Sequence, residues 1–197
     1  LDFTTLEKRK FYCEEELRLN RRLAPETYLG VVPIRLDAAG GLRLNGGGAI
    51  VEYAVRMKRL PRERMLGRLL AEGRVDDAAI DAIAAKLARF HRAAETGGRI
   101  DEIGGVETIR RNHEENFTQT ADYVGVTLSR GCYAFIRDYA RTFIDGQEPL
   151  LRRRVAEHRI RDGHGDLHLE HICITDGEIT IFDCIEFNER FRFADVA

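Results

Sequence analysis

The stretch RDGHGDLHLEHICITDGEITIFD, residues 161–183, decides how this chain is interpreted. Two apolar runs within it flank the pair Asp176-Gly177, and an Asp-Gly pair in that setting is a strong signal for a β-hairpin. A hairpin folds back on itself, so its entrance and its exit lie side by side. We therefore expect Asp166, before the hairpin, and Asp183, at its end, to be neighbours in space.

Two carboxylates at one end of a hairpin, outside its hydrogen-bond ladder, suit a pairing of one general base with one metal ligand. Gly163 and Gly165 stand on either side of His164. Glycine allows the backbone to turn sharply there, which would place an exposed polar loop directly before apolar strands.

Outside this stretch the apolar spacing changes between helical and strand-like periods. It predicts a first helix over residues 4–23, capped by Thr4 or Thr5, and strands near 31–36, 41–45 and 49–57. A boundary near residues 57–61 then separates this β-rich part from a helical part. The helices expected there cover residues 62–72, 76–94, 106–116, 129–144 and 150–158.

Composition excludes several classes of protein. Of 197 residues, 44% are hydrophobic, enough for a sizeable core, which argues against a disordered chain. The net charge of −2 gives no overall basic field for nucleic acid, and no apolar stretch approaches the roughly 20 residues of a membrane span. The opening residues lack a secretory signal. We expect a cytoplasmic globular protein whose partners include neither nucleic acid nor a membrane.

The four cysteines fit this expectation. Cys13, Cys132, Cys173 and Cys184 form no CxxC pair, which favours reduced thiols. Cys173 and Cys184 lie on the predicted hairpin or directly after it, and we expect both to be small core residues rather than metal ligands.

The motif HGDLHLEHI (164–172), followed by ITIFD (179–183), resembles the catalytic and metal-binding loops of aminoglycoside phosphotransferases and their choline-kinase and protein-kinase-like relatives. Their pattern is HGDxHxxN followed by two apolar residues and Asp. Together with LEKRKFYCEEELRLNRRLAP, VEYAVRMKRLP and IFDCIEFNERFRFADVA, the motif is similar to a bacterial family of uncharacterised aminoglycoside-phosphotransferase-like proteins. Members of that family often carry a separate P-loop ATPase domain downstream.

The resemblance implies an α+β, protein kinase-like two-lobed fold. Residues 1–57 would form part of the smaller lobe, a helix with antiparallel strands, and residues 58–197 a mainly helical lobe with the catalytic hairpin. The activity implied is ATP-dependent phosphoryl transfer to a hydroxyl of a small molecule, with ATP and Mg²⁺ as cofactors. Such chemistry needs mainly positioning and charge neutralisation.

The resemblance also implies a role for individual residues. Asp166 matches the catalytic aspartate, and Asp183 matches the aspartate that holds Mg²⁺. Three residues match positions that support the catalytic loop: His164, His168 and Asp195. Four residues match nucleotide-binding positions, the first by pairing with a phosphate-binding lysine and the others by contacting adenine: Glu16, Glu52, Val55 and Met57.

This sequence departs from the family pattern in two respects. His171 occupies the place of a metal-binding Asn, and its nitrogen is a softer ligand that suits Zn²⁺ or Mn²⁺ better than Mg²⁺. The chain also starts at the first helix, without the glycine-rich hairpin and lysine strand, and residues 193–197 resemble the opening of a helix. These features predict a fragment of a larger kinase-like protein that lacks competent catalysis as it stands.

Two alternatives stay open at this point. The cluster of His164, Asp166, His168 and His171 could hold a transition metal in a hydrolase, although metal hydrolases normally collect ligands from several segments. The missing lysine strand and His171 also suit a non-catalytic, nucleotide-binding pseudokinase module.

Overall fold

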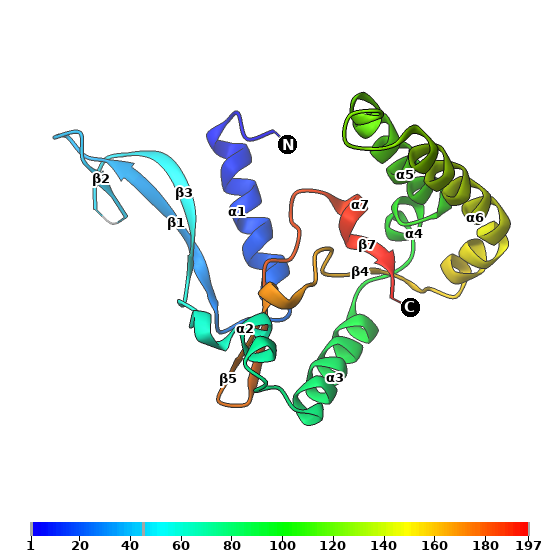
Figure 1. Ribbon diagram of the computed structural model, residues 1–197. Helices are drawn as coiled ribbons and strands as arrows, with labels where there is room; N and C mark the ends of the chain where they lie inside the picture. Colours follow the sequence, from blue (N-terminus) through cyan, green and yellow to red (C-terminus); the bar gives the residue numbers. More distant parts are fainter. Residues whose placement is uncertain (1, 45, 197) are drawn as a thin grey trace. The chain divides into compact units, whose positions relative to one another are not determined.

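The computed structural model describes residues 2–44 and 46–196, in which helices are combined with small antiparallel sheets (Figure 1). The described chain divides into two compact units. The first runs to Ala93 and resumes over His164–Arg192, and the second comprises Ala94–Gly163 and the residues from Phe193 onward. The predicted lobe boundary coincides with the end of a strand at Met57, whereas the compact units divide elsewhere. The assignment of lobes stays a prediction.

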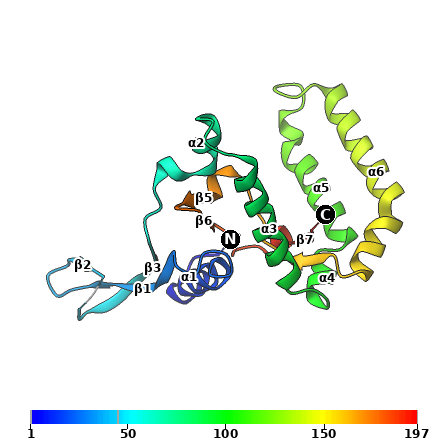
Figure 2. The same ribbon diagram turned by 90° about the horizontal axis from the view of Figure 1, so that it is seen from below.

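The first unit begins with a helix that packs on a three-stranded antiparallel sheet in the order β2-β1-β3. Its elements are α1 (Leu6–Asn20), β1 (Tyr28–Leu36), β2 (Leu42–Arg43) and β3 (Ala49–Met57). Thr5 caps α1, since its side chain accepts a hydrogen bond from the backbone N–H of Lys8. Figures 1 and 2 both show α1 alongside β3. The predicted helix and the strands near 31–36 and 49–57 are confirmed. The strand expected near 41–45 is present only over Leu42–Arg43, and residue 45 lies outside the described residues.

The rest of the first unit surrounds the late hairpin. It consists of the 3-10 turn η1 (Arg62–Arg64), α2 (Leu66–Ala71), α3 (Asp77–Ala93), the 3-10 turn η3 (Leu169–His171), β5 (Ile172–Thr175), β6 (Glu178–Ile181) and α7 (Glu189–Arg192). Asp176 and Gly177 both have positive φ, 52° and 83°, as a tight two-residue hairpin turn requires. The hairpin predicted from this Asp-Gly pair is therefore confirmed.

One apolar cluster joins these elements. It contains Leu23, Leu66, Ile83, Phe90, Ile172 and Ile181, all buried. Three of them come from helical segments far from the hairpin in sequence, so burial of apolar surface anchors the hairpin to the body of the first unit.

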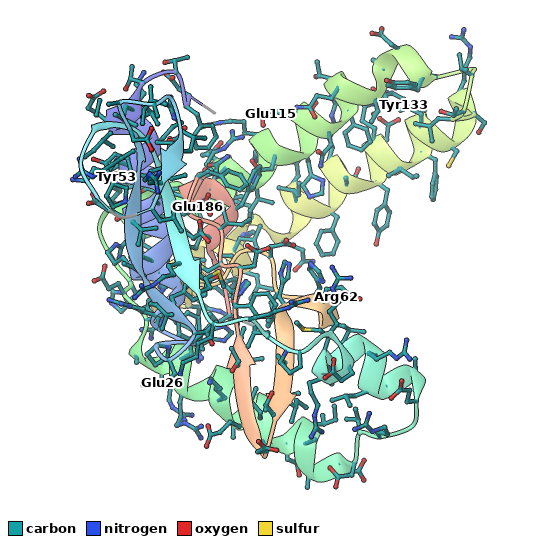
Figure 3. All side chains as sticks on the ribbon, turned by 90° about the vertical axis from the view of Figure 1, so that its left-hand side faces the viewer. Glu26, Tyr53, Arg62, Glu115, Tyr133 and Glu186 are labelled. Carbon is teal, nitrogen blue, oxygen red and sulfur yellow. The ribbon has the colours of Figure 1, made fainter. Side chains whose placement is uncertain are left out.

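The second unit is mainly helical. Its elements are α4 (Arg99–Ile103), α5 (Val106–Thr120), η2 (Ala121–Tyr123), α6 (Arg130–Ala156), β4 (Ile160–Asp162) and β7 (Phe193–Asp195). Tyr133, labelled in Figure 3, joins α6 to α5 because its hydroxyl donates a hydrogen bond to the carbonyl of Phe117 and its ring meets that of Phe117 edge-on.

Two expectations fail in the second unit. Residues 129–144 and 150–158 were expected as separate helices, but α6 runs continuously through Pro149. Proline removes one backbone hydrogen bond, yet Arg110 of α5 bonds to Asp145 and Glu148 just before it and holds α6 in place there.

Residues 193–195, expected to open a helix, form strand β7. The physical reason is the antiparallel partner β4, which pairs Ile160 with Asp195. A three-residue strand becomes stable only when such a partner is beside it, and the local sequence does not reveal that partner. Among the helices of the described residues, none combines the length and the apolar content that a bilayer crossing needs.

Candidate functional site

The loop before the hairpin is tied to the segment after it by one buried imidazole. His164 is 4% exposed, and its Nε2–H donates to the carbonyl of Phe182 at 2.9 Å. Its Nδ1 accepts a hydrogen bond from the backbone N–H of Asp166 at 3.3 Å. Burial lowers the pKa of His164 and so favours the neutral ring. The hydrogen bond to Phe182 acts in the opposite direction but is the smaller effect. His164 thus connects the neighbour of Asp183 to Asp166.

Glycine is required at position 165, between His164 and Asp166. Gly165 has φ +91°, and a Cβ there would lie 3.1 Å from the carbonyl oxygen of Phe191 and 3.2 Å from the side chain of Ile185. Both the left-handed backbone and the close approach exclude a larger residue. The sharp turn expected from the glycines around His164 is present at this position.

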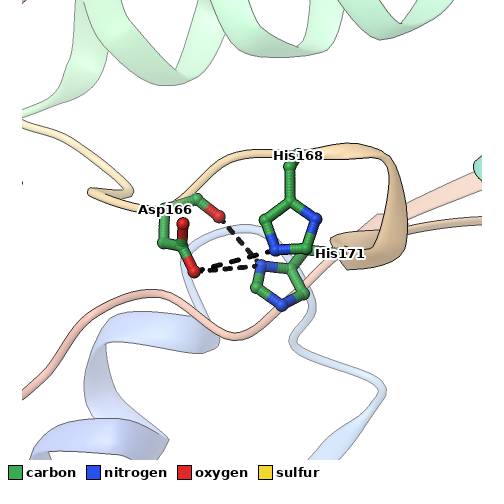
Figure 4. A group of neighbouring side chains, drawn as sticks. All are labelled: Asp166, His168 and His171. Atoms are coloured by element: carbon green, nitrogen blue, oxygen red, sulfur yellow. Dashed lines mark hydrogen bonds and ion pairs between the residues drawn. The ribbon is translucent and has the colours of Figure 1, made fainter. Parts of the chain in front are cut away.

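Asp166, His168 and His171 form a compact group in the loop (Figure 4). The Oδ2 atom of Asp166 lies 3.7 Å from Nε2 of His168 and 3.9 Å from Nδ1 of His171. The two imidazole rings lie 3.8 Å apart, centroid to centroid. The Asp166 carboxylate is 56% exposed, so it is accessible to a solute.

Two hydrogen bonds assign the protons in this group. Nδ1 of His171 lies 2.8 Å from the carbonyl oxygen of Asp166, which can only accept, so Nδ1 carries the proton. Nδ1 of His168 accepts a hydrogen bond from the backbone N–H of Glu170, which leaves the proton of a neutral ring on Nε2.

Asp183 lies on the far side of His171, with its Oδ2 atom 3.0 Å from Nε2 of that ring. Asp166 and Asp183 therefore face opposite nitrogens of one imidazole. The hairpin predicted that the two aspartates are neighbours, but not that His171 lies between them. The Asp183 backbone has φ +66°, a conformation that strains a residue with a side chain. Its N–H donates to the hydroxyl of Tyr28 at 3.2 Å, which supports this conformation from β1.

Two glutamates interact electrostatically with Asp183. Burial, followed by the charges of Glu186 and Asp183, raises the pKa of Glu16 to about 7. Burial and Asp183 also raise the pKa of Glu186, which Figure 3 labels. Every cause acting on Glu16 favours the neutral acid, so a cation brought to this position would be stabilised.

The other predicted nucleotide-binding residues lie on β3. The single Nε–H of Arg9 on α1 is shared between the two carboxylate oxygens of Glu52, at 2.9 and 2.7 Å. Val55 is half-buried and pairs with β1, as does Met57. Their contact with adenine stays a prediction.

Asp195 belongs to the second unit and to a strand, not to the helix expected around it. Its carboxylate forms an ion pair with Arg154 of α6. Its proposed support of the catalytic loop also stays a prediction.

Sequence reasoning missed Tyr28 and Glu186. Tyr28 is 1% exposed and contacts Asp183 from a strand that is remote in sequence, and no local signal marks it. Glu186 follows Asp183 by three residues, and that proximity was the available signal. The expectation for Cys173 and Cys184 as core residues is confirmed, since they are 0% and 2% exposed.

The donor atoms fit one part of the expected Mg²⁺ site and not another. Carboxylate oxygens of Asp166 and Asp183 are hard ligands that suit Mg²⁺. His171 offers a nitrogen where the family pattern has an amide oxygen, and Mg²⁺ seldom takes nitrogen. The complete donor set therefore does not fit Mg²⁺ as the resemblance implies.

Neither a protein-family model nor a solved structure matches this chain. The chain is similar to Uncharacterized protein Mb2027c of Mycobacterium bovis and to Uncharacterized protein Rv2004c of Mycobacterium tuberculosis, with 34% identity over 194 residues in each case. The match covers 98% of this chain but 37% of each relative, so the chain spans little more than a third of their length.

Proposed function

We propose that this chain carries the catalytic and metal-binding loops of an ATP-dependent phosphotransferase that acts on a hydroxyl group of a small molecule. The observation that supports this most is the position of Asp166 and Asp183 on opposite nitrogens of His171. The buried His164 holds the two loops together. Phosphoryl transfer needs such fixed carboxylates more than it needs reactive side chains.

Asp166 is the residue we assign to the acceptor. Its carboxylate is exposed, and the imidazoles of His168 and His171 lie within 4 Å of Oδ2. A carboxylate so placed would orient an incoming hydroxyl and accept its proton while the hydroxyl oxygen bonds to the terminal phosphorus of ATP and ADP leaves from that phosphorus. Asp183 would supply an anionic ligand for the cation that accompanies the nucleotide.

The wider architecture belongs to the same proposal. We assign α1 and the β1–β3 sheet to the smaller lobe of a protein kinase-like fold and the hairpin to its larger lobe. The matched relatives are much longer than this chain, which leaves room for a covalently linked P-loop ATPase domain. A cytoplasmic location suits an enzyme that consumes ATP.

The hydrolase alternative receives less support from the hydrogen bonds. Nδ1 and Nε2 of His164 both bond to backbone groups, and Nδ1 of His168 also accepts a backbone hydrogen bond. A four-residue metal site built from this loop would have to break those bonds.

The test uses the full-length protein with ATP, Mg²⁺ or Mn²⁺, and a panel of sugars, amino alcohols and nucleosides. Phosphorylated product is detected by mass spectrometry. We expect Asp166→Asn to reduce turnover by about 10²–10⁴-fold while nucleotide affinity is retained. Asp183→Asn should weaken binding of the metal–nucleotide complex.

Asp176→Asn is the matched control, because Asp176 lies at the exposed tip of the same hairpin and asparagine tolerates its positive φ. It should behave as the wild type. Wild-type turnover in Asp166→Asn would refute the catalytic assignment. Nucleotide binding without any turnover that depends on Asp166 would favour the pseudokinase module instead.

A further inference from the structure

The long helix α6 carries a row of uncharged, exposed residues along one side. They follow one another at alternating steps of four and three residues, which is the heptad spacing of helices that pair along their length. We call this row the α6 seam; all its members are exposed, and they are Cys132, Ile136, Tyr139, Phe143, Gly146 and Leu150. Phe135, which is 69% exposed, lies beside the seam and its ring stacks on that of Tyr139.

The other side of α6 is the side that contacts α5. Tyr133 donates a hydrogen bond to the Phe117 carbonyl, and Arg141 pairs with Glu114. Within the second unit, Figures 1 and 2 both show α5 along one side of α6. A surface helix normally turns its apolar stripe toward its packing partner and its charges toward solvent. In α6 the charges meet α5 and the apolar stripe does not, so the α6 seam is suited to a different contact.

We propose that the α6 seam is a dimerisation surface, on which α6 packs antiparallel against α6 of a second copy of this chain. This proposal is independent of the phosphotransferase proposal. The spacing of the seam reads the same from either end, and a two-fold axis requires such self-complementarity because each residue meets the partner of its own counterpart. Antiparallel pairing places residues of one copy opposite those of the other in three pairs: Tyr139 with Phe143, Ile136 with Gly146, and Cys132 with Leu150.

The sizes of the paired side chains favour the antiparallel direction. A Cβ at Gly146 would have no atom within 4 Å, so the space beside this glycine is open to the Ile136 side chain of the second copy. Leu150 would likewise meet the small Cys132, and two aromatic rings would meet at the centre. Parallel pairing would instead place Gly146 opposite Gly146 and leave a gap between the helices, which close-packed interfaces avoid.

The exposed apolar area is sufficient for a dimer of modest affinity. The exposed fractions of Phe135, Ile136, Tyr139, Phe143 and Leu150 are 69%, 49%, 62%, 53% and 38%. With about 200 Å² for each such side chain, these fractions amount to about 550 Å² per copy. Both copies together would bury about 1,100 Å², at the lower limit for a specific protein interface. We therefore expect a dimer whose population depends on protein concentration.

The first experiment measures the mass of the full-length protein by sedimentation equilibrium between about 1 μM and 1 mM, a range that covers weak dimers. We expect the mass to rise from that of one chain toward that of two. Tyr139→Glu places a charge in the centre of the paired surface and should weaken association by about 10-fold or more. Asp138→Asn is the matched control, since Asp138 is exposed, lies next to Tyr139 and is outside the seam; it should associate as the wild type does.

The second experiment tests the direction of pairing through the native thiol of Cys132. Leu150→Cys, oxidised with copper phenanthroline, should form a disulfide with Cys132 of the second copy, because crossing helices bring facing Cα atoms within disulfide range. We expect a covalent dimer on a non-reducing gel. The same substitution combined with Cys132→Ser should give none. A covalent dimer in that double variant would show parallel pairing and overturn the arrangement proposed.

Three further results would overturn the proposal. A mass of one chain across the whole range excludes the dimer. Association that Tyr139→Glu leaves unchanged, with native circular dichroism, assigns the dimer to another surface. A mass of one chain together with alkylation of Cys132 at least tenfold slower than that of the thiol in Asp138→Cys would show that a segment of the same longer polypeptide covers the α6 seam.

Discussion

The two compact units are stabilised in different ways. In the first unit, residues from α2, α3, β5 and β6 bury their side chains in one apolar cluster beneath the site. In the second unit, the cluster formed by Ile100, Ile160 and Phe193 lies at the base of the helices. The α5–α6 pair above it carries ion pairs such as Arg141 with Glu114.

The exposed face of α6 sharpens this contrast. Phe135, Tyr139 and Phe143 follow one another at a spacing of four residues, stack along the helix, and are each more than half exposed. The comparison teaches that the carboxylates and histidines of the site are supported by a close-packed core, whereas α5 and α6 are joined by exposed ion pairs together with the contact of Tyr133 with Phe117. Variants in the two units should therefore differ in magnitude and in their response to salt and pH.

The largest expected effect is that of Ile181→Ala. Ile181 is 0% exposed in β6, two residues before Asp183, and its truncation leaves a cavity in the core of the first unit. We expect a loss of about 3–4 kcal/mol in the free energy of unfolding, measured by urea denaturation with hydrogen exchange resolved by peptide. Ile136→Ala on the exposed face of α6 is the control and should cost less than about 1 kcal/mol. Equal losses would contradict the contrast between the units.

Gly104→Ala tests the packed base of the second unit. A Cβ at this position would lie 2.3 Å from Cγ2 of Ile160 and 2.9 Å from the carbonyl oxygen of Phe193. Such overpacking should destabilise this unit by about 1–3 kcal/mol, seen as faster hydrogen exchange in α4, β4 and β7. Gly146→Ala in α6 meets open space and should stabilise instead, by about 0.5–1 kcal/mol.

Glu16→Gln should change the pH dependence of stability. The pKa of Glu16 is raised from 4.5 to about 7 in the folded protein, so between these values the folded state binds more protons than the unfolded state. The free energy of unfolding of the wild type therefore falls as pH rises through this window. Glutamine removes that dependence, and we expect the variant to be more stable by about 1–2 kcal/mol at pH 8, after allowance for partial exposure, and equal near pH 4.

Glu7→Gln is the control for this pH experiment. The pKa of Glu7, in the first turn of α1, is lowered by its hydrogen bonds to the backbone and to Thr5. Its contribution has the opposite sign, since stability rises with pH only below the unfolded pKa of 4.5 and is fully present above it, and the glutamine variant lacks this contribution. Thermal unfolding of both variants from about pH 2 to pH 8 separates the two signs.

The smallest expected effect concerns the exposed ion pairs of the second unit. Arg141→Met removes the two hydrogen bonds to Glu114, which join α6 to α5. We expect hydrogen exchange in these helices to quicken by less than about threefold, and 1 M NaCl to erase the difference from the wild type. A difference that persists in 1 M NaCl would show that packing, not charge, is what the arginine contributes.

Sequence patterns predicted the regular elements well where the signal was local. The Asp176-Gly177 turn, the cap at Thr5 and the strand ending at Met57 all depend on a few consecutive residues. Patterns failed at β7, whose partner β4 lies more than thirty residues earlier, and at Pro149, where an ion pair from α5 preserves the helix. In the site, the same limit applies to Tyr28, which reaches Asp183 from β1.

The sequence alone predicts the hairpin, because backbone preferences and apolar alternation act over short distances. The hairpin in turn predicts that Asp166 and Asp183 lie close together. The orientation of the His171 ring, the proton on its Nδ1 and the burial that raises the pKa of Glu16 came only with the folded chain. These properties arise from atoms that are distant in sequence and meet in space. Hydrogen bonding, desolvation and Coulomb interactions depend on those distances and not on the order in which residues are joined.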